Sequence, residues 1–325
     1  MFNYLKSGLI IIFCLEILAY FIYIPLLKKQ KVKQAVRGDG PKNHLKKSGT
    51  PTMGGLIFGI FIILGYIGGL KLLNVPINTK TTLIIMISLI GYGLLGFIDD
   101  YLIVVKKNNL GLKANIKFII QLVLASFIYL ILLINHHPST INIFGYIIDL
   151  SFMYGVFLMF FFSATTNSVN LSDGLDGLAS GIIVTILIGC MFLGYFKNNT
   201  EVVVLSLVSI VSLLAFMFFN LNPAKIFMGN VGSMFLGGLL SIIFVILECE
   251  ILLIVMGLIL VIETLSDIIQ VTYFKYSKGK RIFKMAPIHH HLELLEYSEW
   301  QIDLIFWAFS LVMSLLGVIM GVQLF

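Results

Sequence analysis

The sequence predicts an all-α polytopic membrane protein with about ten transmembrane helices. Hydrophobic residues make up 59% of the 325 residues and charged residues only 12%. The mean hydropathy of +1.02 is far above that of a soluble domain of this size. The apolar residues form unbroken runs of about 20, which is the length of a membrane-spanning helix. Because only helices or closed barrels satisfy the backbone in lipid, unbroken runs favour helices.

The predicted spans are joined mostly by short connections, so we expect one integral membrane domain over residues 1–325. The spans are 8–27, 54–73, 81–98, 116–134, 146–166, 178–196, 201–221, 233–248, 251–273 and 301–325. The first run is too long for the apolar core of a signal peptide and lacks a convincing small-residue cleavage site. We therefore interpret it as a span.

The distribution of positive charge predicts the orientation in the membrane. Of the 22 Lys and Arg residues, 18 fall in the loops after the first, third, fifth, seventh and ninth spans. By the positive-inside rule these loops are cytoplasmic and both termini lie outside. The net charge of +6 is therefore mainly topological, and we expect no nucleic-acid partner. The three cysteines are scattered without metal-binding or redox spacing and are interpreted as packing residues.

Polar residues near the start of the chain give two expectations. Glu16 lies inside the first span, and an acid at that depth is expected to face the bundle or a partner. Most lysines of the loop that follows are expected to lie near anionic lipid headgroups. Lys47 and Thr52 differ because they precede the second span closely, where they can reach a phosphate.

Asp99 and Asp100 are adjacent at the end of the third span. Neighbouring carboxylates repel, which raises one pKa unless a cation lies between them. The pair therefore suits a Mg²⁺ site or a general base. The alternative, a helix end whose acids simply meet water, has near even weight on this pair alone.

The segment 167–179, NSVNLSDGLDGLA, is the main candidate site. Asp173 and Asp176 are each followed by glycine, and Asn167 and Asn170 lie just upstream. Clustered acids are costly near lipid and indicate a working site. Glycine lets backbone approach a ligand closely. The acids are expected at the start of a helix, where N–H groups also attract phosphate.

Two later cytoplasmic segments are also polar. The segment FNLNPAKIFMGN contains Asn220, Phe227 and Asn230, and spacing alone places the phenylalanine in the core rather than stacked on a base. The ninth span carries Glu263 and Asp267 on one helical face, so that they line a cleft or pair with basic groups of the next loop.

Three histidines, His289 to His291, follow a proline that is expected to stop any helix. Consecutive histidines do not share a helical face, which argues against a structural zinc site. A loop that presents imidazoles to an anionic ligand fits better, although an exposed polar turn is the simpler interpretation of this tract alone.

Because all these segments lie on the cytoplasmic side, we expect them to converge in one cleft. Mg²⁺ and nearby lysines would offset the repulsion among the acids, as suits phosphoryl transfer from a diphosphate.

These segments resemble the polyprenyl-phosphate N-acetylhexosamine-1-phosphate transferase superfamily, and within it the phospho-N-acetylmuramoyl-pentapeptide-transferase branch. The resemblance rests on the strings DGPKNHLKKSGTPTMGG, GFIDDY, NSVNLSDGLDGLA, FNLNPAKIFMGN and GKRIFKMAPIHHHLE. It implies a ten-helix enzyme of the bacterial inner membrane, expected to be a homodimer. The implied reaction moves phospho-MurNAc-pentapeptide from UDP-MurNAc-pentapeptide to undecaprenyl phosphate, giving lipid I and UMP with Mg²⁺.

The resemblance also implies roles for individual residues. It assigns catalysis to the aspartate pair and the histidines, with Asp99 as a candidate base, and Mg²⁺ binding to Asp100 and Asn230. It implies substrate contacts for Lys47, Thr52, Lys117, Asn167, Asn170, Asp173, Asp176, Asn220 and Phe227. Phe227 matches a uracil-stacking position, which reverses the interpretation drawn from spacing.

The chain departs from the family pattern at two positions. Asn230 stands where the family has a third catalytic aspartate, a magnesium ligand, and Ile103 stands where it usually has lysine. An asparagine still offers a carbonyl oxygen to Mg²⁺ but lacks the charge. A catalytically weakened relative that still binds substrate is therefore an alternative. A membrane transporter is less favoured because no internal repeat is visible, and an intramembrane aspartyl protease less still.

Overall fold

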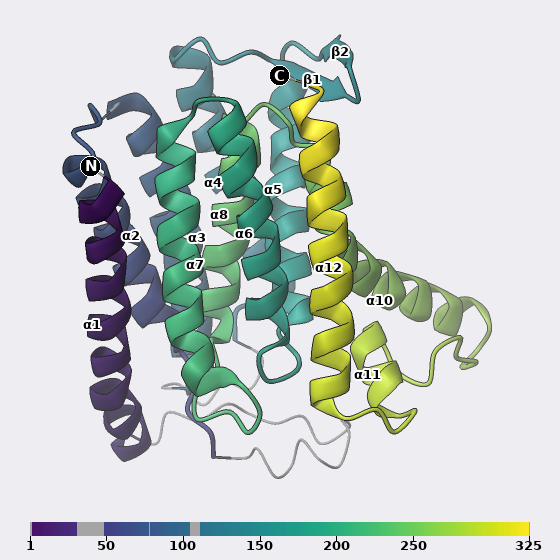
Figure 1. Cartoon of the computed structure of the whole chain (residues 1–325). Helices are drawn as coiled ribbons and strands as arrows, with labels where there is room; N and C mark the ends of the chain where they lie inside the picture. Colours follow the sequence, from purple (N-terminus) through teal and green to yellow (C-terminus); the bar gives the residue numbers. More distant parts are fainter. Residues whose placement is uncertain (1, 31–48, 78, 105–110, 325) are drawn as a thin grey trace.

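A computed structural model describes residues 2–30, 49–77, 79–104 and 111–324. In these ranges the chain forms a bundle of long helices with one short hairpin (Figure 1). The long helices are α1 (Phe2–Lys29), α2 (Gly55–Leu72), α3 (Thr79–Val104), α4 (Ala114–Ile134), α5 (Met153–Ser172), α6 (Leu178–Phe196), α7 (Thr200–Asn220), α8 (Gly229–Ile246), α10 (Leu258–Tyr276) and α12 (Glu299–Val322). The short elements are α9 (Leu252–Met256), α11 (Ile288–Glu293) and the antiparallel strands β1 (Thr140–Ile143) and β2 (Tyr146–Asp149).

Eight of the described helices are long and apolar enough to cross a membrane, namely α1 to α4, α6 to α8 and α12. Each coincides with a predicted span to within a few residues. The prediction of an all-α polytopic membrane protein is therefore confirmed.

The other two predicted spans, 146–166 and 251–273, differ from the structure. Residues 146–149 form β2, and α5 begins at Met153 and continues through polar residues to Ser172. The second of these spans is interrupted at Gly257, between α9 and α10. Both differences arise within apolar runs, where hydropathy alone does not separate a strand or a break from a continuous helix.

Helix α8 lies at the centre of the bundle, with 83% of its span buried, against 17% for α1. Glycines bring its backbone into contact with two neighbouring helices. A Cβ on Gly55 of α2 would lie 2.1 Å from Cα of Gly232, and one on Gly96 of α3 would lie 2.1 Å from the carbonyl oxygen of Asn230. Small residues permit such close approach of membrane helices. The first turn of α8 is therefore fixed directly against α2 and α3.

Polar side chains define two other helix starts. Asn199 Oδ1 accepts a hydrogen bond from the Val202 N–H at the beginning of α7. At the beginning of α12, Ser298 and Gln301 form a capping box in which each side chain accepts from the other's backbone N–H. These bonds satisfy N–H groups that have no partner inside the helix.

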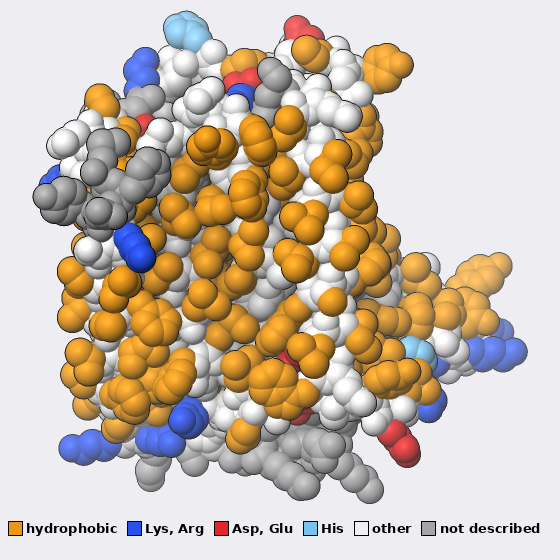
Figure 2. All heavy atoms as spheres, in the orientation of Figure 1, with side chains coloured by type: hydrophobic (Ala, Val, Ile, Leu, Met, Phe, Trp, Pro, Cys, Tyr) orange, Lys and Arg blue, Asp and Glu red, His pale blue; other side chains and the backbone are white. Residues whose placement is uncertain are grey.

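The bundle has an apolar flank and two different ends. Figure 2 shows hydrophobic side chains covering the flank, as expected of a surface in lipid. The hairpin, the beginning of α1 and the end of α12 lie toward one end, and α11 lies toward the other (Figure 1). Helix α10 diverges from the bundle toward the α11 end. Because successive helices alternate in direction, the ends of α3 and α5 and the beginning of α8 lie at that same end.

Candidate active site

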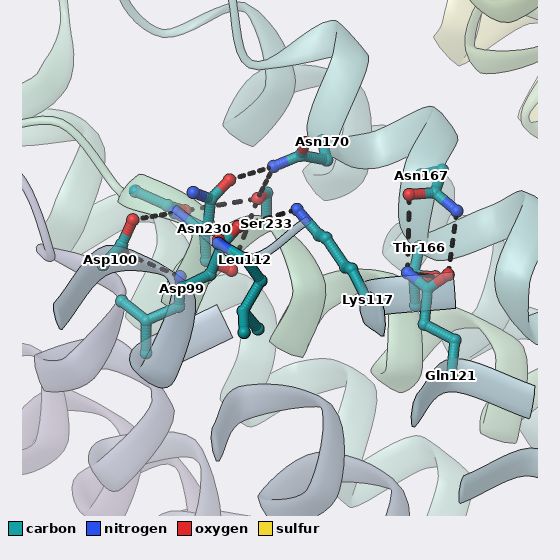
Figure 3. A network of polar contacts seen from close by, with 12 residues as sticks. Asp99, Asp100, Leu112, Lys117, Gln121, Thr166, Asn167, Asn170, Asn230 and Ser233 are labelled. Atoms are coloured by element: carbon teal, nitrogen blue, oxygen red, sulfur yellow. Dashed lines mark hydrogen bonds and ion pairs between the residues drawn. The ribbon is translucent and has the colours of Figure 1, made fainter. Parts of the chain in front are cut away.

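The first turn of α8 holds the carboxylate of Asp100. Asp100 Oδ1 accepts a hydrogen bond from the Asn230 N–H at 3.1 Å, and Oδ2 accepts one from the Val231 N–H at 3.0 Å (Figure 3). N–H groups at a helix start have no partner within the helix and carry partial positive charge, which favours an anion. Gly229 permits this approach, because its φ is +72° and a Cβ there would lie 2.5 Å from Asp100 Oδ2 and 2.8 Å from Thr52 Oγ1. Thr52 and Asp100 therefore lie at the same corner of the site.

Asp99 is directed to different partners. Its Oδ2 accepts from Lys117 Nζ of α4 at 2.9 Å, and its Oδ1 accepts from the Leu112 N–H at 2.7 Å (Figure 3). Asp99 and Asp100 are only 4% and 3% exposed. The alternative of helix-end acids that simply meet water is therefore wrong. Lys117 and the start of α8 each offset the charge of one carboxylate, which reduces the cost of burying the pair.

Asn170 joins α5 to the same turn of α8. Its Nδ2 donates to Asn230 Oδ1 at 2.6 Å and to Ser233 Oγ at 2.8 Å (Figure 3). Asn167 lies one turn earlier on α5 and makes different contacts. Its Nδ2 donates to Gln121 Oε1 of α4 at 3.0 Å, and Gln121 Nε2 lies 3.4 Å from Asn167 Oδ1. Asn170 thus belongs to the cluster at α8, whereas Asn167 ties α5 to α4 beside it.

The two acids of the segment 167–179 lie in the turn between α5 and α6, just before the start of α6. Asp173 directly follows α5, and Gly177 precedes α6. Burial raises the pKa of Asp173 well above its usual range, and the charges of Asp100 and Asp176 raise it further. Asn170 and Asp100 both contact Asn230, so the end of α5 that leads into this turn lies beside the acids of α3, as predicted.

Asp176 and Asn220 connect this turn to the segment between α7 and α8. Asp176 Oδ2 accepts from the Ala224 N–H at 2.9 Å and from Asn222 Nδ2 at 3.2 Å. Asn220 Oδ1 accepts from the Gly177 N–H at 3.0 Å, and its Nδ2 donates to the Ile226 carbonyl at 2.9 Å. Both side chains are almost fully buried, at 2% exposure each. In this structure they hold the two loops in register.

Phe227 connects the same segment to the start of α2 through its backbone. Its N–H donates to the Pro51 carbonyl at 2.9 Å, and its carbonyl accepts from the Gly54 N–H at 2.8 Å. The Phe227 side chain is partly exposed, so it is not a fully buried core residue. Lys47, predicted to reach a phosphate near here, lies outside the described residues.

The histidine tract forms the short helix α11, so the expectation of a loop is wrong. Pro287 directly precedes this helix, a place where proline favours a helix instead of stopping it. His289 is fully buried and its Nδ1 lies 2.7 Å from Glu263 Oε2 of α10. His290 Nδ1 lies 2.7 Å from Glu293 Oε2, and His291 Nδ1 accepts from the Lys284 N–H at 3.1 Å. His290 and His291 are partly exposed, so they are the histidines accessible to a ligand.

Comparison with known proteins identifies the family. Residues 82–248 match glycosyl transferase family 4, and residues 47–58 match signature 1 of the phospho-N-acetylmuramoyl-pentapeptide-transferases. The phospho-N-acetylmuramoyl-pentapeptide-transferase of Staphylococcus epidermidis is 42% identical over 307 residues, which cover 93% of this chain and 94% of the relative. The chain belongs to the phospho-N-acetylmuramoyl-pentapeptide-transferase family. The transferases of Staphylococcus saprophyticus and Staphylococcus aureus are 42% and 41% identical, with the same coverage.

The two segments of the chain that match these family models contact each other in the structure. The family 4 match contains every site residue from Asp99 to Asn230. The signature contains Thr52, whose segment pairs with the backbone at Phe227. The family resemblance drawn from the motifs is thereby confirmed.

Several contacts of the site were not predicted from the sequence. Ser233, Gln121 and Glu299 were not singled out, although Glu299 Oε2 accepts from the Asp176 N–H at 3.3 Å. Glu263 was expected to line a cleft or pair with the next loop, and it does pair with His289 from that segment. That expectation came from the position of an acid within an apolar helix.

Proposed function

We propose that the chain transfers phospho-MurNAc-pentapeptide from UDP-MurNAc-pentapeptide to undecaprenyl phosphate, giving lipid I and UMP. The activity named for relatives of 42% identity over 93% of the chain supports this. The observation that carries the proposal is the meeting of Asp99, Asp100 and the α5–α6 turn at the first turn of α8. Such a cluster at the end of an apolar bundle suits a reaction between a soluble nucleotide and a lipid phosphate.

The residues divide between the two substrates. Asp99 is the proposed base for undecaprenyl phosphate, and Lys117 holds it at 2.9 Å. An oxygen of the lipid phosphate then attacks the phosphorus attached to the sugar, and the bond to UMP breaks. Proposed contacts to the nucleotide sugar come from Asn170, Asp173, Asp176, Phe227 and the partly exposed His290 and His291. Four further residues are proposed to contact the substrates or to hold the residues that do, namely Asn167, Asn220, Thr52 and Lys47.

The donors near α8 fit Mg²⁺ in part. Asp100 and Asn230 supply oxygen atoms, which Mg²⁺ prefers, and each oxygen keeps a lone pair beyond its present hydrogen bond. Among the described residues no group of three or more acids, histidines or cysteines forms a metal site. Mg²⁺ often binds through one or two protein ligands together with waters and substrate phosphates. When bound it would neutralise diphosphate charge, while Asp100 and Asn230 would hold it beside the turn.

Asn230→Asp is expected to lower the Mg²⁺ concentration for half-maximal activity by about 10-fold, equivalent to about 1.4 kcal/mol. The new carboxylate adds negative charge beside Asp100, and its oxygen can still accept from Asn170 Nδ2. The measurement is UMP release against Mg²⁺ concentration, together with stabilisation of the protein by Mg²⁺ in thermal unfolding without substrate.

Asn198→Asp is the control for this change, since it makes the same substitution in the exposed loop before α7. It should leave both Mg²⁺ curves unchanged. Unaltered Mg²⁺ dependence in Asn230→Asp would show that position 230 does not contribute to metal binding.

The direct test of function is UMP release by purified protein incubated with UDP-MurNAc-pentapeptide, undecaprenyl phosphate and Mg²⁺. We expect UMP only when all three are present. Retained binding of the nucleotide sugar without UMP release would favour a weakened relative. That second candidate rests on Asn230 at the centre of the cluster, where its oxygen is already bound by Asn170.

We further propose a bacterial inner-membrane location with the site facing the cytoplasm, both termini outside and a homodimeric assembly. The distribution of lysine and arginine supports the orientation. The structure is compatible with it, because α1 begins and α12 ends away from the α11 end (Figure 1).

A further inference from the structure

Glu263 and His289 form a buried pair that joins α10 to the histidine helix α11. Glu263 Oε2 lies 2.7 Å from His289 Nδ1, and the two side chains are 0% and 1% exposed. A polar pair so deeply buried is stable only because each group satisfies the other. Among the residues that the structure describes, neither Glu263 Oε1 nor His289 Nε2 has a hydrogen-bond partner.

The free edge of this imidazole meets the turn that carries the acids of the site. A Cβ on Gly174 would lie only 2.2 Å from His289 Nε2 and 2.8 Å from Cε1. Gly174 directly follows Asp173, so the imidazole contacts the turn beside the first of its two acids. A residue with any side chain would push the ring and the turn apart. The contact therefore sets the distance between α11 and the α5–α6 turn.

We propose that Glu263 is a positioning residue, which holds His289 with its Nδ1–H toward α10 and its Nε2 edge against Gly174. An imidazole hydrogen-bonded on one nitrogen is fixed in both ring orientation and tautomer. Through this contact Glu263 keeps the partly exposed His290 in register with Asp173. The inference deepens the proposed function, because it assigns to the pair the alignment of two groups around the nucleotide sugar.

A purely structural role for the pair makes a different prediction. A pair that only fastened α11 to α10 would change the thermal stability of the protein, with no selective effect on one substrate. Positioning of the turn instead affects the nucleotide sugar and leaves the KM for undecaprenyl phosphate unchanged. The two roles are thus separated by comparing the kinetic constants for the two substrates.

The first experiment is a double-mutant cycle with Glu263→Gln and Gly174→Ala. Glu263→Gln keeps the size of the side chain, so the fold should persist, but its amide can either donate to or accept from Nδ1 and no longer fixes the tautomer. We expect each single variant to lower kcat/KM for UDP-MurNAc-pentapeptide by about 10- to 100-fold, as for other residues that orient an imidazole. The kcat/KM of the double variant should be no lower than that of the more impaired single variant, because both changes disturb the same contact.

Glu248→Gln is the matched control, since it removes a carboxylate that pairs with Lys197 at 3.5 Å in the loop after α8. It should leave both kinetic constants unchanged. Additive losses in the cycle, or losses of stability with unaltered kcat/KM, would overturn the positioning role.

A second measurement does not depend on turnover. In wild-type protein labelled with ¹⁵N-histidine, the ¹⁵N shifts of His289, assigned with His289→Gln, should show a hydrogen on Nδ1 and an unprotonated Nε2. The opposite tautomer would refute the inference even if the protein is active. Conversely, absence of UMP release with the expected tautomer would refute the proposed function while leaving the geometry of the pair intact.

Discussion

Asp99→Asn is expected to lower the rate of UMP release by about 10²- to 10⁴-fold, the usual contribution of a general base. The amide cannot accept a proton, and it removes the charge that Lys117 Nζ contacts at 2.9 Å. Folding should be largely retained, because the amide oxygen can still accept from the Leu112 N–H. The measurement is single-turnover UMP release at saturating substrates.

Asp149→Asn provides the control, because Asp149 is an exposed acid of the hairpin whose Oδ1 accepts from the Ser151 N–H. This variant should have the activity of the unmodified protein. If Asp99→Asn kept a turnover within a few-fold of that value, Asp99 would not be the base.

Gly96→Ala is expected to destabilise the protein by about 3 kcal/mol, the upper part of the usual range for overpacking, and to abolish most activity. The new Cβ would lie 2.1 Å from the Asn230 carbonyl oxygen and 2.7 Å from Cα of Val231. Because the crowded atoms are backbone, side-chain rotation cannot relieve the contact. Helices α3 and α8 must separate, and the hydrogen bonds from α8 to Asp100 are then lost. Thermal unfolding in detergent and UMP release measure the two effects.

Gly68→Ala is the matched control, because a Cβ on Gly68 of α2 would have nothing within 4 Å. It should be neutral or slightly stabilising, since alanine favours the helix. Equal melting temperatures for the two variants would show that contact between α3 and α8 does not limit stability.

Much of the fold was predictable from the sequence because lipid imposes a simple rule on it. Runs of about 20 apolar residues must be helical, and eight predicted spans match helices that are apolar enough to cross a membrane. The incorrect predictions concern strands and breaks within apolar runs, which hydropathy does not distinguish from continuous helix. The apolar residues Tyr146 to Ile148 continue into the next run but form a strand, and Gly257 interrupts a run that hydropathy treats as continuous. Pro287 was interpreted as stopping a helix, whereas it precedes one.

The sequence predicted which polar segments come together to form the site, but it did not predict the hydrogen bonds between them. Charge placed the acidic and polar segments on one side, and the structure brings Asp100 and Asn170 together at Asn230, as predicted. The partners of Asp176 and His289 come from segments 48 and 26 residues away in the chain. Such pairs depend on helix packing and leave no pattern of spacing in the sequence. The roles of individual residues in binding and catalysis stay predictions.

The carboxylate of Asp100 accepts hydrogen bonds from the main-chain N–H groups of residues 230 and 231. Every residue except proline supplies the same N–H, so the side chain at position 230 can vary without releasing the Asp100 carboxylate. The Asn230 side chain itself accepts from Asn170 Nδ2, so the backbone and the side chain of this residue do separate work. A substitution at this position therefore changes the chemistry of one side chain while the backbone that holds Asp100 stays as it is.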